Sequence, residues 1–343
     1  MTNLHTHNQE EMNDYKRIMR QVDNADQIVI TSHKSPDGDS IGSSLALYHF
    51  LRAYGKNPVV CHPDAAPSFL TWMPGGQEIL HFENNPDVVA EKMASADLIF
   101  CLDYNASNRI GKDMEVHLLS SEAIKIMIDH HMDPADFCEI VVSETSVCST
   151  SQLIYELIDQ SGNIELLDEN TGTAIYLGIM TDTGSFRFPS VQPRTHAILE
   201  HLLKSGVQHY KIHENVFDTN TIDRLKLRGY AISEKMEILA DLPVAIISLS
   251  EEELNRFNNQ KGDTEGLVNV ALSVHGIEMA AFFAEKDGII KISFRSKGDR
   301  YVNVMAGDHF AGGGHKYASG GMSTDSLKDT IDRFKKVVYN YFN

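Results

Sequence analysis

Aspartate and histidine residues follow several of the apolar runs in this chain of 343 residues. The sequence HKSPDGDS follows the run IVIT, a single aspartate follows LIFCL, and the triplet DHH follows IKIMI. Another aspartate comes near the end of the helix-like segment NTGTAIYLGIMTDTGSF. The residues concerned are His33, Asp37, Asp39, Asp103, Asp129, His130, His131 and Asp182. Each one alone is a weak signal, and for Asp39 a helix cap is an equally good interpretation, because aspartate commonly caps helices.

The combination of these residues predicts a metal site. Carboxylates and imidazoles gathered at one sheet edge would repel one another, or be costly to desolvate, unless cations lay among them. Oxygen and nitrogen ligands without thiolate favour Mn²⁺ or Mg²⁺ over a structural zinc ion. Two ions about 3.5–4 Å apart can activate a water and stabilise both oxygens of an in-line phosphoryl displacement. Enough ligands for two ions, with one carboxylate shared, are present in His33, Asp37, Asp39, Asp103, His130 and Asp182.

The C-terminal part of the sequence contains candidate phosphate-binding residues. Gly312, Gly313 and Gly314 precede His315, so backbone N–H groups can approach an anion without Cβ obstruction. A triple glycine alone is more often a plain turn. Arg295 and Ser296 at the end of a predicted strand favour the phosphate interpretation, because arginine matches phosphate geometry.

Arg187, five residues beyond Asp182, is a further candidate for contact with the scissile phosphate. An exposed surface arginine explains it equally well.

The elements that must position these residues form a βα pattern. The apolar continuity of the runs 27–31, 57–61, 97–102 and 124–128 predicts strands covered on both faces, hence a mainly parallel sheet. Open parallel sheets bind ligands beyond the carboxyl ends of their strands, which is where the aspartates and histidines lie. Helical spacing of apolar residues is present at 11–22.

We therefore expect an α/β protein with a mainly parallel-sheet catalytic domain over residues 1–190 and a helical connector over 191–233. A smaller mixed-sheet α/β domain is expected over 234–343. Its predicted strands are 244–248, 266–274, 279–285 and 289–295, and its predicted helices are 302–310 and 326–341.

Composition limits the function classes. Acidic residues outnumber basic ones by 48 to 30, for a formal charge of -18, which argues against a broad basic track for long duplex nucleic acid. The four cysteines have no CxxC spacing and are expected to be reduced thiols. No apolar run reaches membrane-spanning length and the first residues do not resemble a secretory signal, so we expect a cytoplasmic protein without a membrane partner.

The motifs HKSPDGDSIGS, LDYN, IDHH and MTDTGSF, in that order, resemble the four successive motifs of DHH phosphoesterases. The C-terminal FRSKGDR and FAGGGHKYASGG are similar to the DHH-associated substrate-binding domain of that family. The resemblance therefore covers nearly the whole chain. Length and domain pairing most resemble the bacterial nanoRNase/pAp phosphatase group within the family.

This resemblance implies a role for each position. His33 and Asp37 would hold a first metal ion, and Asp39, His130 and Asp182 a second, with Asp103 bridging them. Asp129 would orient a histidine through the ring nitrogen that does not bind metal. His131 would face the phosphate as hydrogen-bond donor or acid. The ions expected are two Mn²⁺, with Mg²⁺ or Co²⁺ as alternatives.

The expected activity is hydrolysis of short RNA or DNA oligonucleotides, or of 3′-phosphoadenosine 5′-phosphate (pAp). Two alternatives share the metal motifs: a phosphodiesterase of cyclic or linear dinucleotides, and an inorganic pyrophosphatase or exopolyphosphatase. A non-catalytic nucleotide sensor is the alternative from outside enzymology. The sequence leaves a homodimer open.

Overall fold

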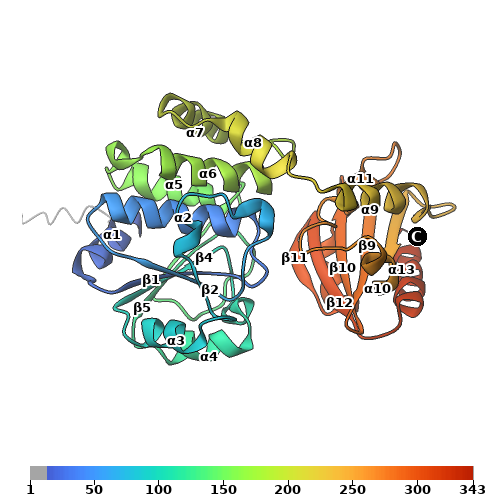
Figure 1. Cartoon of the computed structure of the whole chain (residues 1–343), viewed down its shortest axis with the longest axis horizontal. Helices are drawn as coiled ribbons and strands as arrows, with labels where there is room; N and C mark the ends of the chain where they lie inside the picture. The colour runs from blue at the N-terminus through green and yellow to red at the C-terminus, as the bar shows by residue number, and fades with distance from the viewer. Residues whose placement is uncertain (1–13, 343) are drawn as a thin grey trace, which may run out of the picture. The chain divides into compact units, whose positions relative to one another are not determined.

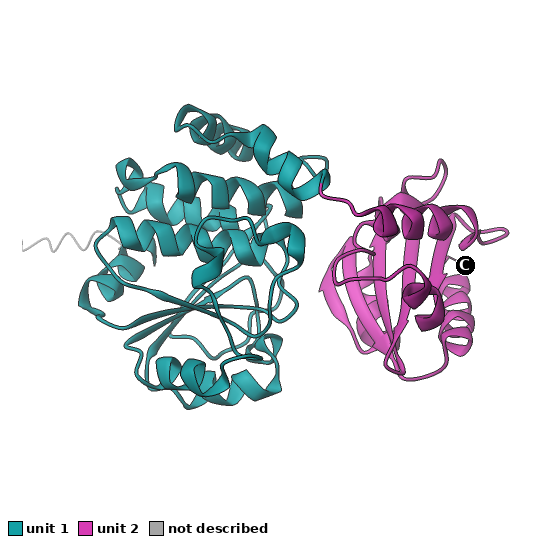
Figure 2. Ribbon diagram, viewed as in Figure 1, with its two compact units in different colours: residues 1–218 teal, residues 219–343 magenta. Residues whose placement is uncertain are grey.

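A computed structural model describes residues 14–342, which divide into two compact units, 1–218 and 219–343 (Figures 1 and 2). Residues 191–218 of the expected connector pack within the first unit, and residues 219–233 belong to the second. The beginning of the helix expected at 11–22, including Met12, lies outside the described residues.

The first unit contains a six-stranded parallel sheet in the order β3-β2-β1-β4-β5-β6. Its strands are β1 (Ile28–Ser32), β2 (Val59–His62), β3 (Leu80–His81), β4 (Leu98–Leu102), β5 (Ile124–Asp129) and β6 (Ile140–Ser143). The four predicted strands are confirmed. The short strands β3 and β6 at the two edges escaped sequence-based prediction.

Helices cover both faces of this sheet (Figure 1). One layer consists of α1 (Asp14–Asn24), α2 (Gly38–Ala53), α5 (Thr150–Gln160) and α6 (Glu169–Asp182), followed by α7 (Pro193–Lys204) and α8 (His209–Phe217). The opposite layer consists of α3 (Pro86–Ala94) and α4 (Lys112–Ser120). Successive residues of β1 alternate between the two cores, with Ile28 and Ile30 in one and Val29 in the other. This alternation explains why the strands read as continuous apolar runs.

The strand order places a ligand-binding position between β1 and β4. The chain goes from β1 to β2 and β3 on one side, and then to β4, β5 and β6 on the other. Ser32, Leu102 and Ile128 are aligned across β1, β4 and β5. The residues that follow them must therefore lie beside one another at the carboxyl edge, at the point where open α/β sheets bind ligands.

The second unit contains a mixed sheet in the order β11-β12-β10-β9-β8-β7, in which only β8 and β9 pair in parallel. Its strands are β7 (Met236–Ile238), β8 (Val244–Leu249), β9 (Met279–Lys286), β10 (Ile289–Ser296), β11 (Gly313–His315) and β12 (Ala318–Ser323). One core lies against α12 (Val302–Phe310) and α13 (Leu327–Phe342), and another against α9 (Ile222–Ser233), α10 (Glu251–Arg256) and α11 (Leu267–Leu272). The predicted α/β class, with one parallel and one mixed sheet, is confirmed.

One predicted strand of this unit is wrong. Residues 266–274 do not form a strand but contain the helix α11, which Gly266 precedes in a left-handed conformation. Leu267, Val268 and Ala271 are the buried residues, and this spacing of one and four places them on one helix face. The short run of apolar residues did not distinguish a strand from a buried helix.

Candidate metal centre

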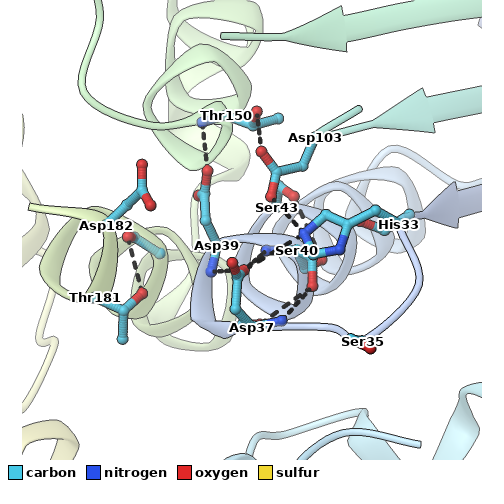
Figure 3. A network of polar contacts seen from close by, with 12 residues as sticks. His33, Ser35, Asp37, Asp39, Ser40, Ser43, Asp103, Thr150, Thr181 and Asp182 are labelled. Atoms are coloured by element: carbon cyan, nitrogen blue, oxygen red, sulfur yellow. Dashed lines mark hydrogen bonds and ion pairs between the residues drawn. The ribbon is translucent and has the colours of Figure 1, made fainter. Parts of the chain in front are cut away.

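The loop between β1 and α2 positions three of the predicted ligands. Asp37 is the N-cap of α2, and its carboxylate accepts hydrogen bonds from the backbone N–H groups of Asp39 (3.1 Å) and Ser40 (3.0 Å). Capping therefore falls to Asp37, while Asp39 lies buried in the first turn of the helix. This compact turn brings His33, Asp37 and Asp39 to the same edge of the sheet (Figure 3).

The N-terminus of α5 holds Asp39. The backbone N–H groups of Thr150 and Ser151 donate to the two carboxylate oxygens of Asp39, at 2.7 and 2.9 Å. A helix N-terminus carries partial positive charge, so it favours the ionised carboxylate there. Thr150 Oγ1 also donates to Asp103 Oδ1 at 3.0 Å (Figure 3).

Asp103 lies immediately after β4 in a left-handed backbone conformation, with φ of 63°. Only 2% of the residue is exposed. A non-glycine residue in this region is unfavourable unless the surroundings hold it, and such residues cluster at functional sites. The turn directs the Asp103 carboxylate toward His33 and His130.

The two histidines approach Asp103 from opposite oxygens. His33 Nε2 lies 3.4 Å from Asp103 Oδ2 and 3.7 Å from Asp37 Oδ1. His130 Nε2 lies 3.5 Å from Asp103 Oδ1, 3.8 Å from Asp39 Oδ2 and 3.4 Å from Asp182 Oδ2. Most of these separations are too long for good hydrogen bonds. At 3.4–3.8 Å they equal or slightly exceed the roughly 3.0–3.4 Å that separates two ligand atoms when each lies about 2.1 Å from one ion.

The tautomer of His33 suits metal binding. Its Nδ1 lies 2.9 Å from the carbonyl oxygen of Lys34, which can only accept a hydrogen bond. Nδ1 must therefore carry a proton, so the neutral ring has its lone pair on Nε2, the atom that faces Asp103 and Asp37.

Among the groups of donor atoms that could hold an ion, two consist only of predicted metal ligands, and both contain Asp103. One group is His33, Asp37 and Asp103, and the other is Asp39, Asp103 and His130, each with ligand atoms within 4.8 Å of one another. Asp182, at the end of α6, lies beside the second group through His130. The donor set contains only carboxylate oxygens and imidazole nitrogens, which fits Mn²⁺ or Mg²⁺.

The charges of the site favour a bound cation. Burial raises the pKa of Asp39 well above its ordinary value, and the charges of Asp103 and Asp182 raise it further. Burial by itself lowers the pKa of His33, but the nearby carboxylates of Asp103 and Asp37 outweigh burial and raise the pKa well above the ordinary value. Without an ion, protons must neutralise the site; divalent ions would do so at neutral pH.

Asp129 and His131 form a pair beside the two groups. His131 Nδ1 donates to Asp129 Oδ1 at 2.7 Å, and Asp129 is fully buried at the end of β5. Burial lowers the pKa of His131, but the hydrogen bond to Asp129 and the charges of Asp103 and Asp129 raise it above its ordinary value, against an opposing charge on Arg109. The pair fixes the orientation of the His131 ring, with Nε2 directed away from Asp129.

Arg187 lies in the turn that follows Asp182. Gly184, Ser185 and Phe186 are consecutive left-handed residues, with φ of 56°, 62° and 65°. The exposed Arg187 side chain donates from Nε to the carbonyl oxygen of Gly184 at 2.7 Å. The turn therefore fixes the position of the Arg187 side chain, five residues after the predicted ligand Asp182.

In the second unit, the glycine-rich segment begins the edge strand β11. A Cβ on Gly312 would lie 2.0 Å from the carbonyl oxygen of Gly320, and a Cβ on Gly314 would lie 2.8 Å from that of Ala318. These two glycines allow β11 to approach β12. Gly313 is different, because nothing lies within 4 Å of the position its Cβ would take.

The other candidates of this unit lie at the end of β10 and at the end of β11. Arg295 donates from Nη1 to the carbonyl oxygen of Phe294 at 2.9 Å. The Ser296 hydroxyl is buried and donates to the carbonyl oxygen of Arg300, so it stabilises the turn after β10. His315 is half-buried at the end of β11, and its carbonyl oxygen accepts from Ser319 Oγ at 2.8 Å.

Comparison with known proteins agrees with this architecture. The model of the DHH family N-terminal domain matches residues 27–179, and that of the DHHA1 domain matches residues 242–343. A crystal structure of an exopolyphosphatase-related protein from Bacteroides fragilis is 40% identical, with a TM-score of 0.91 over 96% of each chain. The chain belongs to the DHH family.

Two further relatives of this DHH-family chain are named for activities on nucleotides. The bifunctional oligoribonuclease and PAP phosphatase NrnA of Thermus thermophilus is 30% identical over 296 residues, which cover 85% of this chain and 83% of NrnA. The cyclic-di-AMP phosphodiesterase GdpP of Bacillus subtilis is 26% identical over 94% of this chain but only 49% of GdpP.

This DHH-family chain is a metal-dependent phosphoesterase, and its groups of mostly buried histidine and aspartate residues are consistent with a metal site. Sequence reasoning missed Thr150, Ser151 and Arg109. Thr150 and Ser151 are the first residues of α5, after the N-cap Ser149. A capping serine predicts that a helix begins there, but it does not predict which distant side chain the helix start will contact. Arg109 follows the LDYN motif closely, and its charge acts on His131.

None of the helices in the described part of the chain combines the length and apolarity needed to cross a membrane.

Proposed function

We propose that the protein hydrolyses very short oligonucleotides, releasing nucleoside monophosphates, and also removes a phosphate from pAp. The observation that carries the metal chemistry is the buried Asp103 carboxylate shared by two ligand groups. The substrate class is supported by the similarity to NrnA over most of both chains. A cytoplasmic location suits such substrates.

In this proposal the site would hold two Mn²⁺ ions. His33 and Asp37 would hold one, Asp39, His130 and Asp182 would hold the other, and Asp103 would contribute to both. Such ions lower the pKa of a bound water and neutralise charge that develops on the phosphoryl oxygens.

The protein's own groups would orient the substrate. The Asp129 carboxylate fixes the His131 ring, so that its Nε2 can donate to a phosphate oxygen. Arg187 offers the remaining guanidinium N–H groups to the scissile phosphate, because only its Nε is used by Gly184.

The C-terminal unit would bind a second anionic group of the substrate. Gly313 supports this assignment, because the fold itself has no steric need for glycine there. The absent side chain leaves the backbone of the edge strand open to a phosphate, beside His315 and Arg295.

A second candidate is a phosphodiesterase acting on cyclic or linear dinucleotides, which the similarity to GdpP favours. A third is an exopolyphosphatase, which the Bacteroides fragilis structure favours by its description. Both would use the same metal groups.

One assay separates these functions. Purified protein with Mn²⁺ is offered a labelled dinucleotide, pAp, cyclic di-AMP, pyrophosphate and polyphosphate in parallel. We expect monophosphate from the dinucleotide and AMP from pAp, with little release of phosphate from pyrophosphate or polyphosphate. Dominant turnover of cyclic di-AMP or polyphosphate would replace the proposal with the corresponding alternative, and binding without turnover of any compound would indicate a sensor.

A further inference from the structure

Two tyrosines form an exposed aromatic corner beside the glycine-rich strand of the C-terminal unit. Tyr301 precedes α12, and Tyr317 occupies the turn between β11 and β12. Their ring centroids are 5.7 Å apart with an interplanar angle of 66°, and the two residues are 37% and 38% exposed. The ammonium group of Lys316 lies 5.3 Å from the Tyr301 ring centroid.

Hydrogen bonds hold this corner in place from three sides. The backbone N–H of Ser296 donates to the carbonyl of Tyr317 at 3.1 Å, and that of Val302 donates to the carbonyl of Lys316 at 2.7 Å. The hydroxyl of Tyr341 accepts from the Tyr301 N–H at 2.9 Å and donates to the Tyr301 carbonyl at 3.1 Å. A ligand that stacks here would meet an already ordered aromatic surface, which lowers the entropy lost on binding.

The corner and the candidate anion-binding strand belong to one hairpin. His315 pairs with Ala318 across a turn of only two residues, Lys316 and Tyr317. Gly313, with open space at its Cβ position, lies three residues before the turn, a span of about 10 Å in extended chain. The candidate anion site, a cation and an exposed aromatic surface thus lie within the dimensions of one nucleotide.

We propose that Tyr317, supported by Tyr301 and Lys316, forms a nucleobase-binding subsite that determines the preference for nucleotides over base-free phosphate esters. This inference rests on the proposed function, because it assigns the base of the same substrate. Aromatic stacking tolerates every base, since each has a π-face, so the subsite would bind purines and pyrimidines alike.

Kinetics of the full-length protein provide the first test. Tyr317→Ala should raise KM for a dinucleotide about 5- to 100-fold while kcat changes less than about twofold. Tyr317→Phe should retain the wild-type KM. Ribose 3,5-bisphosphate, which is pAp without its base, should show the same KM with wild type and with Tyr317→Ala. The matched control is Tyr339→Ala, at a 59% exposed tyrosine of α13, which should leave all values unchanged. An equal loss for both substrates, or no loss for the dinucleotide, would overturn the subsite.

A fluorescence experiment tests the subsite without turnover. Trp72 is the single tryptophan of the sequence, so Tyr317→Trp in a Trp72→Phe background gives one reporter at the corner. With EDTA present, AMP should quench its emission saturably, and ribose 5-phosphate should not. Quenching without hydrolysis of any nucleotide would support the subsite and refute the proposed function. Hydrolysis of nucleotides without quenching would support the proposed function and refute the subsite.

Discussion

At the scale of single residues, Asp103 is the side chain on which the metal centre depends most. It contributes to both ligand groups, and its left-handed backbone conformation aims one oxygen toward each histidine. Each of the other predicted ligands belongs to one side of the site. A substitution of Asp103 should therefore weaken metal binding more than a substitution of any other predicted ligand, because it removes a ligand from both groups.

We predict that Asp103→Ala abolishes turnover and lowers bound Mn²⁺ to less than about half of the wild-type content, because both of the proposed ions would lose a ligand. Metal analysis of the purified protein and the dinucleotide assay measure the two effects. Asp136→Ala, at an exposed aspartate, is the control. Near-normal activity with Mn²⁺ in Asp103→Ala would remove the bridging role.

We predict that Asp129→Asn lowers kcat about 10- to 100-fold with bound metal retained. The neutral amide lacks the negative charge with which the Asp129 carboxylate orients the His131 ring and keeps its proton on Nδ1. His131→Gln should have a similar effect. The double variant should be no worse than the stronger single one, because both changes remove the same interaction. Additive losses would mean that the two residues act separately.

At the scale of elements, the metal centre depends on the close approach of α2 and α6. A Cβ on Gly42 of α2 would lie 2.7 Å from the carbonyl oxygen of Ala174, and a Cβ on Gly38 would lie 2.3 Å from Thr181 Oγ1. The two helices carry Asp39 and Asp182 respectively. Small residues at their contact therefore set the distance between two of the proposed ligands.

The substitution Gly178→Ala tests this dependence. Its Cβ would lie 1.9 Å from Ser151 Oγ and 2.6 Å from Asp39 Oδ1, so α6 must move. We expect a loss of about 1–3 kcal/mol in the free energy of unfolding and a lower affinity for Mn²⁺. Chemical denaturation and metal titration measure these.

A matched control is available in α9. Gly229 is also a helical glycine, but its Cβ position is open, so Gly229→Ala should be neutral or stabilising by up to about 1 kcal/mol. Equal effects of the two substitutions would show that helix propensity, and not the α2–α6 contact, decides the outcome.

The edge strand β11 allows a second comparison of glycines. Gly313→Ala should raise KM for the dinucleotide with little change in Tm, because the new methyl group meets no atom of the protein. Gly312→Ala should lower Tm, because its Cβ would collide with the Gly320 carbonyl. Thermal unfolding and steady-state kinetics distinguish the two. An unchanged KM in Gly313→Ala would indicate that no phosphate approaches this strand.

At the scale of the whole molecule, the acidic balance and the metal centre affect stability in the same direction. The formal charge is -18, and several of the acidic groups converge on the buried site. Without divalent ions these carboxylates repel one another or take up protons. The ions should therefore stabilise the folded chain as well as provide the chemistry.

We predict that removing metal with EDTA lowers Tm by several degrees and that adding Mn²⁺ restores it. An ion at 100 times its dissociation constant contributes about 2.7 kcal/mol per independent site. Asp103→Ala should show little of this response. An identical Tm with EDTA and with Mn²⁺ in the wild type would contradict metal binding to the folded state.

The sequence by itself determined the parallel sheet and the positions of the proposed ligands along the chain. Runs such as LIFCL and IKIMI are apolar throughout because both faces of the strand are buried, and the residues after them must reach the carboxyl edge. The similarity of motifs then indicated the DHH family. Local patterns carried this information because strand burial and turn chemistry act over a few neighbouring residues.

Only the tertiary structure decided what holds those ligands. The amides of Thr150 and Ser151 bind a carboxylate 111 and 112 residues away, and Gly178 is required by atoms of two other helices. The helix α11 instead of a strand, and the pairing of Tyr301 with Tyr317, likewise depend on packing between distant segments. No local periodicity encodes such contacts, because their free energy arises only when the folded chain brings the partners together.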